Sequence, residues 1–306
     1  MAISAQDVKQ LKEMTSSGMM DCKRALEETD GDFDAAVKYL REKGLAKASK
    51  KSGRIAAEGL VYTKIDTDKK VGAVIEINSE TDFAAKADRF IEFVELVAQT
   101  IIDNDVNDVE ALKQLKASGS DEKIEDILVD RIATIGENIQ IRRFKRLEGD
   151  IFGYVHNGGG SIIGSIIKIE SDNNADPVVA ACAKDLLLQI TANAPQYINM
   201  EDIPQNVMDS EREIQLEIVK KENEAKPKPQ NVMEKIVEGR MRVFSSDICL
   251  MAQAFVKNPD VTVQKHIESI GKNIKVVEFV RYEKGEGIQK KEDNFAEEVA
   301  SMAAGN

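Results

Sequence analysis

The chain has 306 residues, of which 42% are apolar, and a net charge of −12 from 54 acids and 42 bases. Its length exceeds what one hydrophobic core usually serves, so we expect two or more compact units, and its acidic balance disfavours duplex nucleic acid as the main partner. No stretch approaches roughly 18 apolar residues, and the first residues lack an apolar h-region, so we expect a cytoplasmic protein without a membrane span or secretory signal.

Residues 1–43 predict a small module of three helices. Ser4 is placed to cap the first helix, whose apolar face contains Val8, Leu11 and Met14. A unit of this size buries little surface, so we expect a marginal bundle. The apolar faces of the other two helices are formed by Met19, Met20, Cys22, Ala25 and Leu26, and by Phe33, Ala36, Val37 and Leu40.

Residues 44–56 are predicted to form a basic linker. They are rich in small residues and contain Lys47, Lys50, Lys51 and Arg54. Because no aromatic residues interleave with these bases, a nucleic-acid site is disfavoured. We expect a solvated linker that touches an acidic surface of a partner protein.

The remainder of the chain contains an internal repeat. The segment GLVYTKIDTDKKVGAVIEI from Gly59 corresponds to GYVHNGGGSIIGSIIKI from Gly153. Further on, IGENIQIRRFKRLEGD from Ile135 corresponds to IGKNIKVVEFVRYEKG from Ile270. Each copy predicts a β-hairpin, a helical segment and a returning strand.

The repeat predicts an α+β core built by duplication. We expect two three-stranded antiparallel sheets, each with helices on one face. The first copy is predicted to form core subdomain N, residues 57–146. The second is predicted to form core subdomain C, residues 147–205 and 245–284.

An insertion in the second copy, residues 206–244, predicts an antiparallel helical arm. Its two helical stretches flank the segment KPKP at 226–229, where the prolines prevent the helix from continuing. An arm with an apolar seam is expected to pack on a partner or on a second copy, so a homodimer through this arm is one predicted assembly. Residues 285–306 predict a C-terminal helical module that is either docked on its own domain or offered to a partner.

The sequence lacks the spacing of common catalytic and cofactor sites. No P-loop is present, and Gly158-Gly159-Gly160 lie where a hairpin turn is predicted. His156 and His266 are not spaced as metal ligands, and no GxSxG or HExxH motif occurs. The three cysteines are odd in number and far apart, which predicts reduced thiols. We therefore expect no enzyme activity, no cofactor and no bound metal.

The segment NSETDFAAKAD, residues 78–88, joins a predicted buried strand to a predicted helix. The residues alone favour Asp82 as the N-cap of the helix through Phe90, and Phe83 as a core side chain. The alternative is that the first helical turn presents Phe83 to a partner, because Phe90 and Phe93 already supply the core.

Two stretches, LKEMTSSGMMDCKRAL at 11–26 and EINSETDFAAK at 76–86, resemble the signatures of the bacterial elongation factor Ts family. The likeness extends to GENIQIRR, VEGRM and the tail NFAEEVA, so it covers nearly the whole chain in the family's order. The resemblance implies an N-terminal module similar to ubiquitin-associated domains. It also implies a guanine-nucleotide exchange factor that binds elongation factor Tu, both GDP-bound and nucleotide-free.

The resemblance further implies which residues contact elongation factor Tu. Thr81, Asp82 and Phe83 fall on the family's motif near the magnesium and phosphate site of that partner, where the phenylalanine wedges between helices and dislocates the Mg²⁺. Ala84 stands where the family usually has valine, which reduces one apolar contact.

Five further positions are implied as partner contacts. Lys12 stands where arginine is common, so a bidentate contact there would become a point charge. Met19 and Met20 match paired apolar positions, and we expect one of them in the core. Lys51 belongs to the basic linker, and His156 matches a histidine at the tip of the second hairpin. The main alternative function is a passive adaptor that holds partners together without changing their nucleotide state.

Overall fold

The computed structural model describes residues 3–15, 17–225, 227 and 229–289, so most of the predicted C-terminal module lies outside the described residues. The chain divides into two compact units. Unit 1 comprises Met1–Tyr62, Ile75–Phe144 and Glu283–Asn306, and unit 2 comprises Thr63–Val74 and Lys145–Tyr282. In the part of the chain that the structure describes, no helix is long and apolar enough to cross a membrane.

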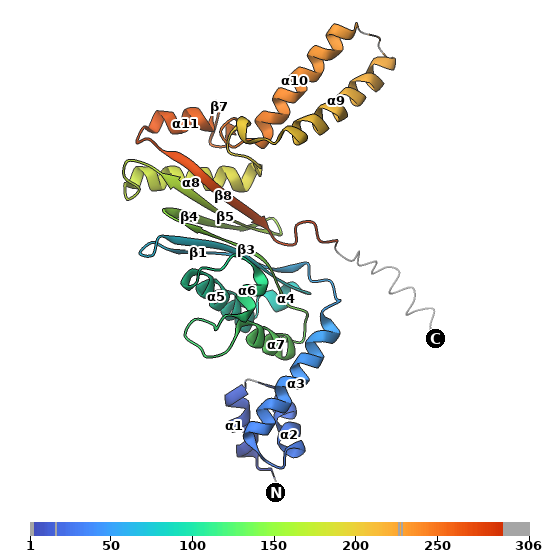
Figure 1. Cartoon of the computed structure of the whole chain (residues 1–306), viewed down its shortest axis with the longest axis vertical. Helices are drawn as coiled ribbons and strands as arrows, with labels where there is room; N and C mark the ends of the chain where they lie inside the picture. Colours follow the sequence, from blue (N-terminus) through green and yellow to red (C-terminus); the bar gives the residue numbers. More distant parts are fainter. Residues whose placement is uncertain (1–2, 16, 226, 228, 290–306) are drawn as a thin grey trace. The chain divides into compact units, whose positions relative to one another are not determined.

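Unit 1 begins with α1 (Ala5–Thr15), α2 (Met19–Glu28) and α3 (Phe33–Lys51), which pack as the predicted three-helix module (Figure 1). The hydroxyl of Ser4 accepts a hydrogen bond from the amide of Asp7 at 3.1 Å, which confirms its capping role. Met14, in contrast, is exposed. The buried core of the module consists of Val8, Leu11, Cys22, Ala25, Leu26 and Ala36.

The third helix is longer than predicted. It continues to Lys51, so the first part of the predicted linker at 44–56 is helical. Gly44 is buried, and a Cβ atom there would lie 3.4 Å from Cγ1 of Val129 on α7 (Ile124–Ile135). The small residues that suggested a solvated linker therefore allow α3 to pack closely on α7.

Two three-stranded antiparallel sheets form the core, as predicted. The strands of the first are, in spatial order, β1 (Glu58–Asp66), β2 (Val71–Ser79) and β3 (Gln140–Glu148). Those of the second are β4 (Ile151–Gly158), β5 (Ser161–Glu170) and β8 (Lys275–Glu283). Gly158 pairs with Ser161, and both intervening glycines have positive φ, so the glycine run is a two-residue hairpin turn.

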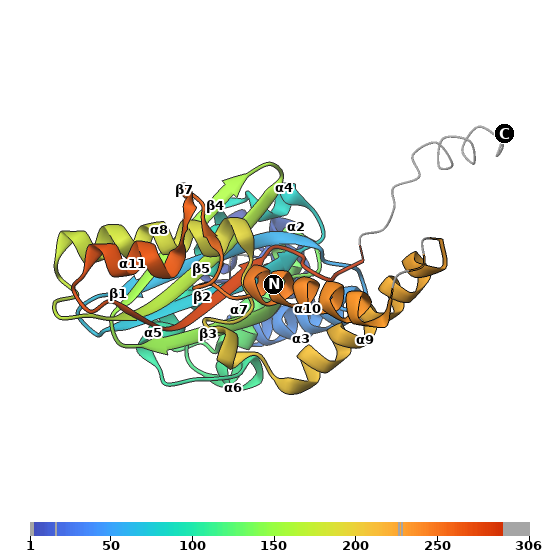
Figure 2. The ribbon, with the colours of Figure 1, turned by 90° about the horizontal axis from the view of Figure 1, so that it is seen from above.

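The helices of unit 1 that follow β2 are α4 (Asp82–Ala85), α5 (Asp88–Asp103), α6 (Val109–Gln114) and α7. Phe90 and Phe93 of α5 are fully buried, as expected. In unit 2, α8 (Pro177–Asn193) packs on β4 and β5, and α11 (Val263–Ile270) lies beside it (Figure 1 and Figure 2). Unit 2 also contains the 3-10 helix η1 (Met200–Asp202) and the short strands β6 (Ala254–Phe255) and β7 (Asn258–Thr262).

The predicted arm is present in unit 2 as α9 (Gln205–Ala225) and α10 (Gln230–Ile248), which form a helical hairpin (Figure 1). Val219, Val237 and Met241 are buried between the two helices. The arm therefore covers its own seam, which differs from the expectation that a partner must cover it. Ile214 and Ile218 remain exposed on α9, and the homodimer stays a prediction.

Candidate partner-binding site

The segment after β2 forms a one-turn helix held by its own cap. All nine residues of β2 are buried, and the strand ends at Ser79. The hydroxyl oxygen of Thr81 accepts a hydrogen bond from the amide of Ala84 at 3.2 Å, so Thr81 is the N-cap of α4. The prediction that Asp82 caps the helix through Phe90 is therefore wrong, because α5 begins separately at Asp88.

Phe83 lies on this short helix and is 80% exposed. Its neighbours Ala84 and Ala85 are buried and anchor the turn to unit 1. The prediction of Phe83 as a core residue is wrong, because its ring is exposed, and its contact with a partner stays a prediction. A large apolar side chain this exposed, on an anchored turn, is a candidate contact for a partner.

Asp82 and Lys86 form an ion pair beside the Phe83 ring. Nζ of Lys86 lies 2.6 Å from the Asp82 carboxylate and 5.9 Å from the centroid of the ring. The hydrogen bond from Lys86 lowers the pKa of the Asp82 carboxyl below its ordinary value. Lys86 was not identified from the sequence, although its spacing of four residues from Asp82 on a helical turn is a local signal.

Thr81 is also held by a loop that is distant in sequence. Its amide donates to one carboxylate oxygen of Glu137 at 2.9 Å, and its hydroxyl donates to the other at 2.7 Å. In return, the carboxylate of Glu80 accepts a hydrogen bond from the amide of Asn138 at 2.6 Å. Sequence reasoning missed these contacts, since nothing local to Thr81 indicates them.

Both methionines of the helical module are exposed, Met19 to 59% and Met20 to 69%. The expectation that one of them lies in the core is wrong, because the buried stripe of α2 begins one turn later, at Cys22. Lys12 is exposed on α1. Together with Met14, which is 57% exposed, these residues give the module a methionine-rich surface that can adapt to a partner.

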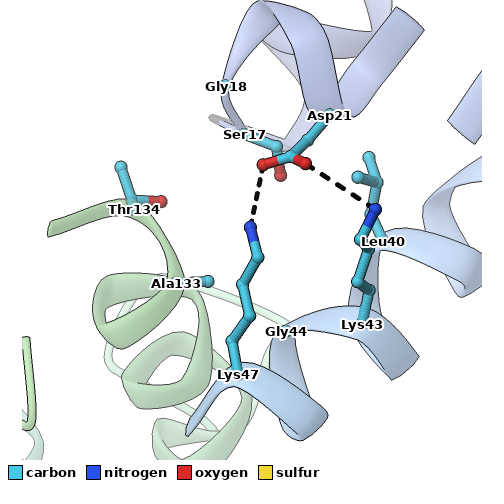
Figure 3. Close-up of a pocket in the computed structure, with 9 residues that line it drawn as sticks. All are labelled: Ser17, Gly18, Asp21, Leu40, Lys43, Gly44, Lys47, Ala133 and Thr134. Atoms are coloured by element: carbon cyan, nitrogen blue, oxygen red, sulfur yellow. Dashed lines mark hydrogen bonds and ion pairs between the residues drawn. The ribbon is translucent and has the colours of Figure 1, made fainter. Parts of the chain in front are cut away.

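The bases of the predicted linker are partly used within unit 1. Nζ of Lys47 lies 2.9 Å from the carboxylate of Asp21, and Nζ of Lys43 lies 3.8 Å from it, so these pairs join α2 to α3 (Figure 3). Lys51 is half-buried, and burial lowers its pKa, with a further contribution from Arg54. A Cβ atom at Gly136 would lie 3.9 Å from Nζ of Lys51, which places this lysine beside the loop that holds Thr81.

His156 belongs to unit 2. It lies on β4, close to the glycine turn, and its side chain is exposed. The hydroxyl of Tyr154 lies 3.3 Å from Nδ1 of His156, which restrains the ring. The residues implied as partner contacts thus lie in both units, with the Thr81–Ala84 turn and the methionine surface in unit 1.

The cysteines offer no reactive thiol. Cys22, Cys182 and Cys249 are free and buried. Burial raises the pKa of Cys182 and of Cys249 to about 11, so neither thiol is ionised near neutral pH. Within the described residues, no group of His, Cys, Asp and Glu side chains is placed to hold a metal ion.

A family model described as "Elongation factor TS" matches residues 80–286, which include the Thr81–Ala84 turn, β3 of the first sheet and the whole second sheet. The chain belongs to the elongation factor Ts family. It is 44% identical over 302 residues to an "Elongation factor Ts" of Halothermothrix orenii, with 98% of each chain covered. It is 45% identical over 307 residues to that of Clostridium botulinum strain Eklund 17B, covering 98% of this chain and 99% of the relative.

A third relative shows the same extent of likeness. The "Elongation factor Ts" of Alkalilimnicola ehrlichii is 44% identical over 309 residues, and the match covers 100% of both chains. The similarity thus includes the N-terminal helical module, which precedes the region matched by the family model. Membership of the elongation factor Ts family places the chain among the translation elongation factors.

Proposed function

We propose that this chain binds elongation factor Tu and promotes the release of GDP from it, with Phe83 as the inserted side chain. The observation that carries the proposal is the 80% exposure of Phe83 on a turn whose cap and neighbours are fixed. The function needs no covalent chemistry. It needs only a rigid apolar projection and a surface that holds the partner while that projection enters.

The mechanism follows from how nucleotide-binding proteins hold Mg²⁺. The ion keeps several waters and takes few protein ligands, so its position depends on the elements around it. An aromatic ring inserted between those elements moves them and loosens the metal and phosphate contacts together. The factor therefore binds nucleotide-free elongation factor Tu more tightly than the GDP-bound form, and by linkage GDP and the factor weaken each other's binding reciprocally.

The size of the effect requires more than one contact. Each tenfold acceleration of GDP release needs about 1.4 kcal/mol of extra stabilisation of the release transition state. Burial of one aromatic side chain contributes roughly 1.5–3 kcal/mol. Phe83 alone therefore supplies a limited acceleration, and Lys12, Met19, Met20, Lys51 and His156 supply binding elsewhere on the partner.

The four residues of the turn take different parts in this proposal. Phe83 enters the partner, and the half-exposed Asp82, paired with Lys86, borders the contact. Ala84 is buried and Thr81 is hydrogen-bonded to Glu137, so these two support the turn. The alanine at position 84, where the family usually has valine, therefore affects the packing that anchors the turn.

The test is stopped-flow release of a fluorescent GDP analogue from elongation factor Tu, with wild type and Phe83→Ala. A matched control is Val178→Ala, which removes an apolar side chain that is 47% exposed on α8 of unit 2. We expect wild type and the control to accelerate release. We expect Phe83→Ala to lose about tenfold or more of that acceleration while its affinity for elongation factor Tu falls less.

Two results would contradict the proposal. Equal losses in affinity and in release rate for Phe83→Ala would make Phe83 an ordinary interface residue. Binding of wild type to elongation factor Tu with no change in GDP release would favour the passive adaptor.

A further inference from the structure

Two loops of unit 1 exchange carboxylate–amide hydrogen bonds next to Phe83. The loop after β2 provides the Glu80 carboxylate to the amide of Asn138, at 2.6 Å. The loop after α7 provides the Glu137 carboxylate to the amide and the hydroxyl of Thr81, at 2.9 and 2.7 Å. Carboxylates that accept backbone hydrogen bonds form the stronger, charge-assisted kind. The two loops are therefore fixed to each other at four adjacent residues.

The internal repeat provides a comparison within the same chain. The position of Glu80 corresponds to Asp172 and that of Asn138 to Asn273. In the second copy the side-chain Nδ2 of Asn273 donates to the Asp172 carboxylate at 2.8 Å, whereas in the first copy the donor is the backbone amide of Asn138. The position of Glu137, however, is occupied by Lys272, whose Nζ lies 2.9 Å from the carboxylate of Asp176. An acid–asparagine contact is thus common to both copies.

The contact between Glu137 and Thr81 occurs only in the copy that carries the exposed phenylalanine. Its counterpart residues, Lys272 and Asn173, cannot reproduce it, because a lysine ammonium has no acceptor for an amide. The acid–asparagine contact found in both copies already joins the end of the strand to the loop. The added glutamate therefore has a role that is specific to the turn of Thr81–Ala84.

We propose that Glu137 is a positioning residue that holds Thr81, and through it Phe83, in the orientation that enters the partner. This inference rests on the proposed function of Phe83. A helix of one turn has little stability of its own, so α4 needs a tertiary anchor. The Thr81 hydroxyl donates to Glu137 and accepts from the amide of Ala84, so Glu137 fixes the rotamer that makes the cap.

The anchor matters because ordering costs free energy at the moment of binding. A side chain whose backbone is already fixed loses less conformational freedom when it is buried against a partner. Phe83 is exposed in the free protein, so the backbone that carries it must be held in place by contacts within its own chain. Without Glu137 the ring would still be present, but the turn that carries it would sample more orientations.

The test measures GDP release from elongation factor Tu with Glu137→Ala, with Phe83→Ala and with the double variant. We expect Glu137→Ala to slow stimulated release by about tenfold, because it removes two charge-assisted hydrogen bonds. In the Phe83→Ala background we expect the same substitution to have little further effect, since it acts through Phe83. Additive losses would overturn the inference, because they would show that Glu137 acts independently of Phe83.

Two further variants separate positioning from folding. Glu137→Gln keeps one oxygen acceptor for the Thr81 amide, so it should recover part of the lost rate. Glu110→Ala removes a glutamate side chain that is 80% exposed on α6, and it should leave the rate unchanged. If Glu137→Ala does not fold, the Glu137→Gln variant in both backgrounds decides the same question.

Hydrogen exchange gives a readout that does not depend on the proposed function. In the free full-length chain, Glu137→Ala should speed exchange of the Thr81 and Ala84 amides while the amides of β2 stay protected. Unchanged exchange at both positions would overturn the anchor itself. If wild type fails to stimulate GDP release, the proposed function fails, and the exchange data still decide whether Glu137 holds the turn.

Discussion

The carboxylate of Glu76, which is completely buried, accepts a hydrogen bond from Nε of Arg143 at 2.6 Å. It also accepts hydrogen bonds from Nη1 of Arg142 at 2.9 Å, from Nδ2 of Asn78 at 3.1 Å and from the amide of Gly285 at 2.8 Å. A buried carboxylate is tolerated only when its lost hydration is replaced in this way. Glu76 therefore joins β2, β3 and the segment after β8 within unit 1.

Removal of this carboxylate should destabilise unit 1 strongly. Glu76→Ala leaves two arginines without their buried partner, and the expected loss is about 3 kcal/mol in the free energy of unfolding. Glu286→Ala is the matched control, because its carboxylate also pairs with Arg143 but is 48% exposed, and it should cost less than about 1 kcal/mol. Urea unfolding followed by circular dichroism compares the two, and equal midpoints would contradict the role of Glu76.

Truncation to alanine should destabilise the protein at one phenylalanine of this segment and have almost no effect on stability at the other. Phe90 is fully buried in α5, so Phe90→Ala creates a cavity and should cost about 3–5 kcal/mol. Phe83 is 80% exposed, so Phe83→Ala should change the free energy of unfolding by no more than about 0.5 kcal/mol. Thermal melting of both variants tests this, and a large loss for Phe83→Ala would show that the ring is packed in solution.

Gly59, near the start of β1, should not tolerate a side chain. Its φ is +124°, and a Cβ atom there would lie 2.2 Å from the carbonyl oxygen of Ile77. Gly59→Ala should therefore cost at least about 2 kcal/mol, from backbone strain and the steric clash together. Gly53→Ala is the control, because a Cβ there meets no atom within 4 Å, and it should leave the urea midpoint unchanged or slightly higher. Similar midpoints for both variants would contradict this account.

Features set by local chemistry could be predicted from the sequence. The alternating strands of the two repeats predicted both sheets, and the glycine run predicted a hairpin turn, which Gly159 and Gly160 make with positive φ. The prolines between α9 and α10 likewise marked the end of a helix. In each case neighbouring residues decide the backbone conformation, so no distant contact has to be known.

Features set by distant contacts could not be predicted. The cap at Thr81 depends on Glu137, which is 56 residues away, and both Thr81 and Asp82 are residue types that cap helices. The extension of α3 past Gly44 depends on packing against Val129. Met19 and Met20 are exposed because the buried stripe of α2 begins after them. Helical periodicity alone does not determine where along a helix the buried stripe begins.

The pairing of Asp21 with Lys47 should make the helical module sensitive to acid. The hydrogen bond from Lys47 lowers the pKa of the Asp21 carboxyl below its ordinary value of about 4. A carboxyl whose pKa is lower in the folded than in the unfolded state stabilises the fold above its unfolded pKa. That contribution is lost as the pH falls through the folded pKa. Asp21→Asn should therefore weaken the module near neutral pH, and its difference from wild type should shrink as the pH falls below about 4.

Hydrogen exchange of the α2 amides in the full-length chain measures this, with wild type and Asp21→Asn compared at each pH. Lys47→Ala removes the other half of the pair and should reproduce the loss at neutral pH (Figure 3). Glu42→Gln removes an exposed carboxylate of α3 and should change the protection of α2 little. If the difference between wild type and Asp21→Asn did not shrink as the pH was lowered below about 4, the asparagine would be acting through packing, because protonation of Asp21 removes the ion pair.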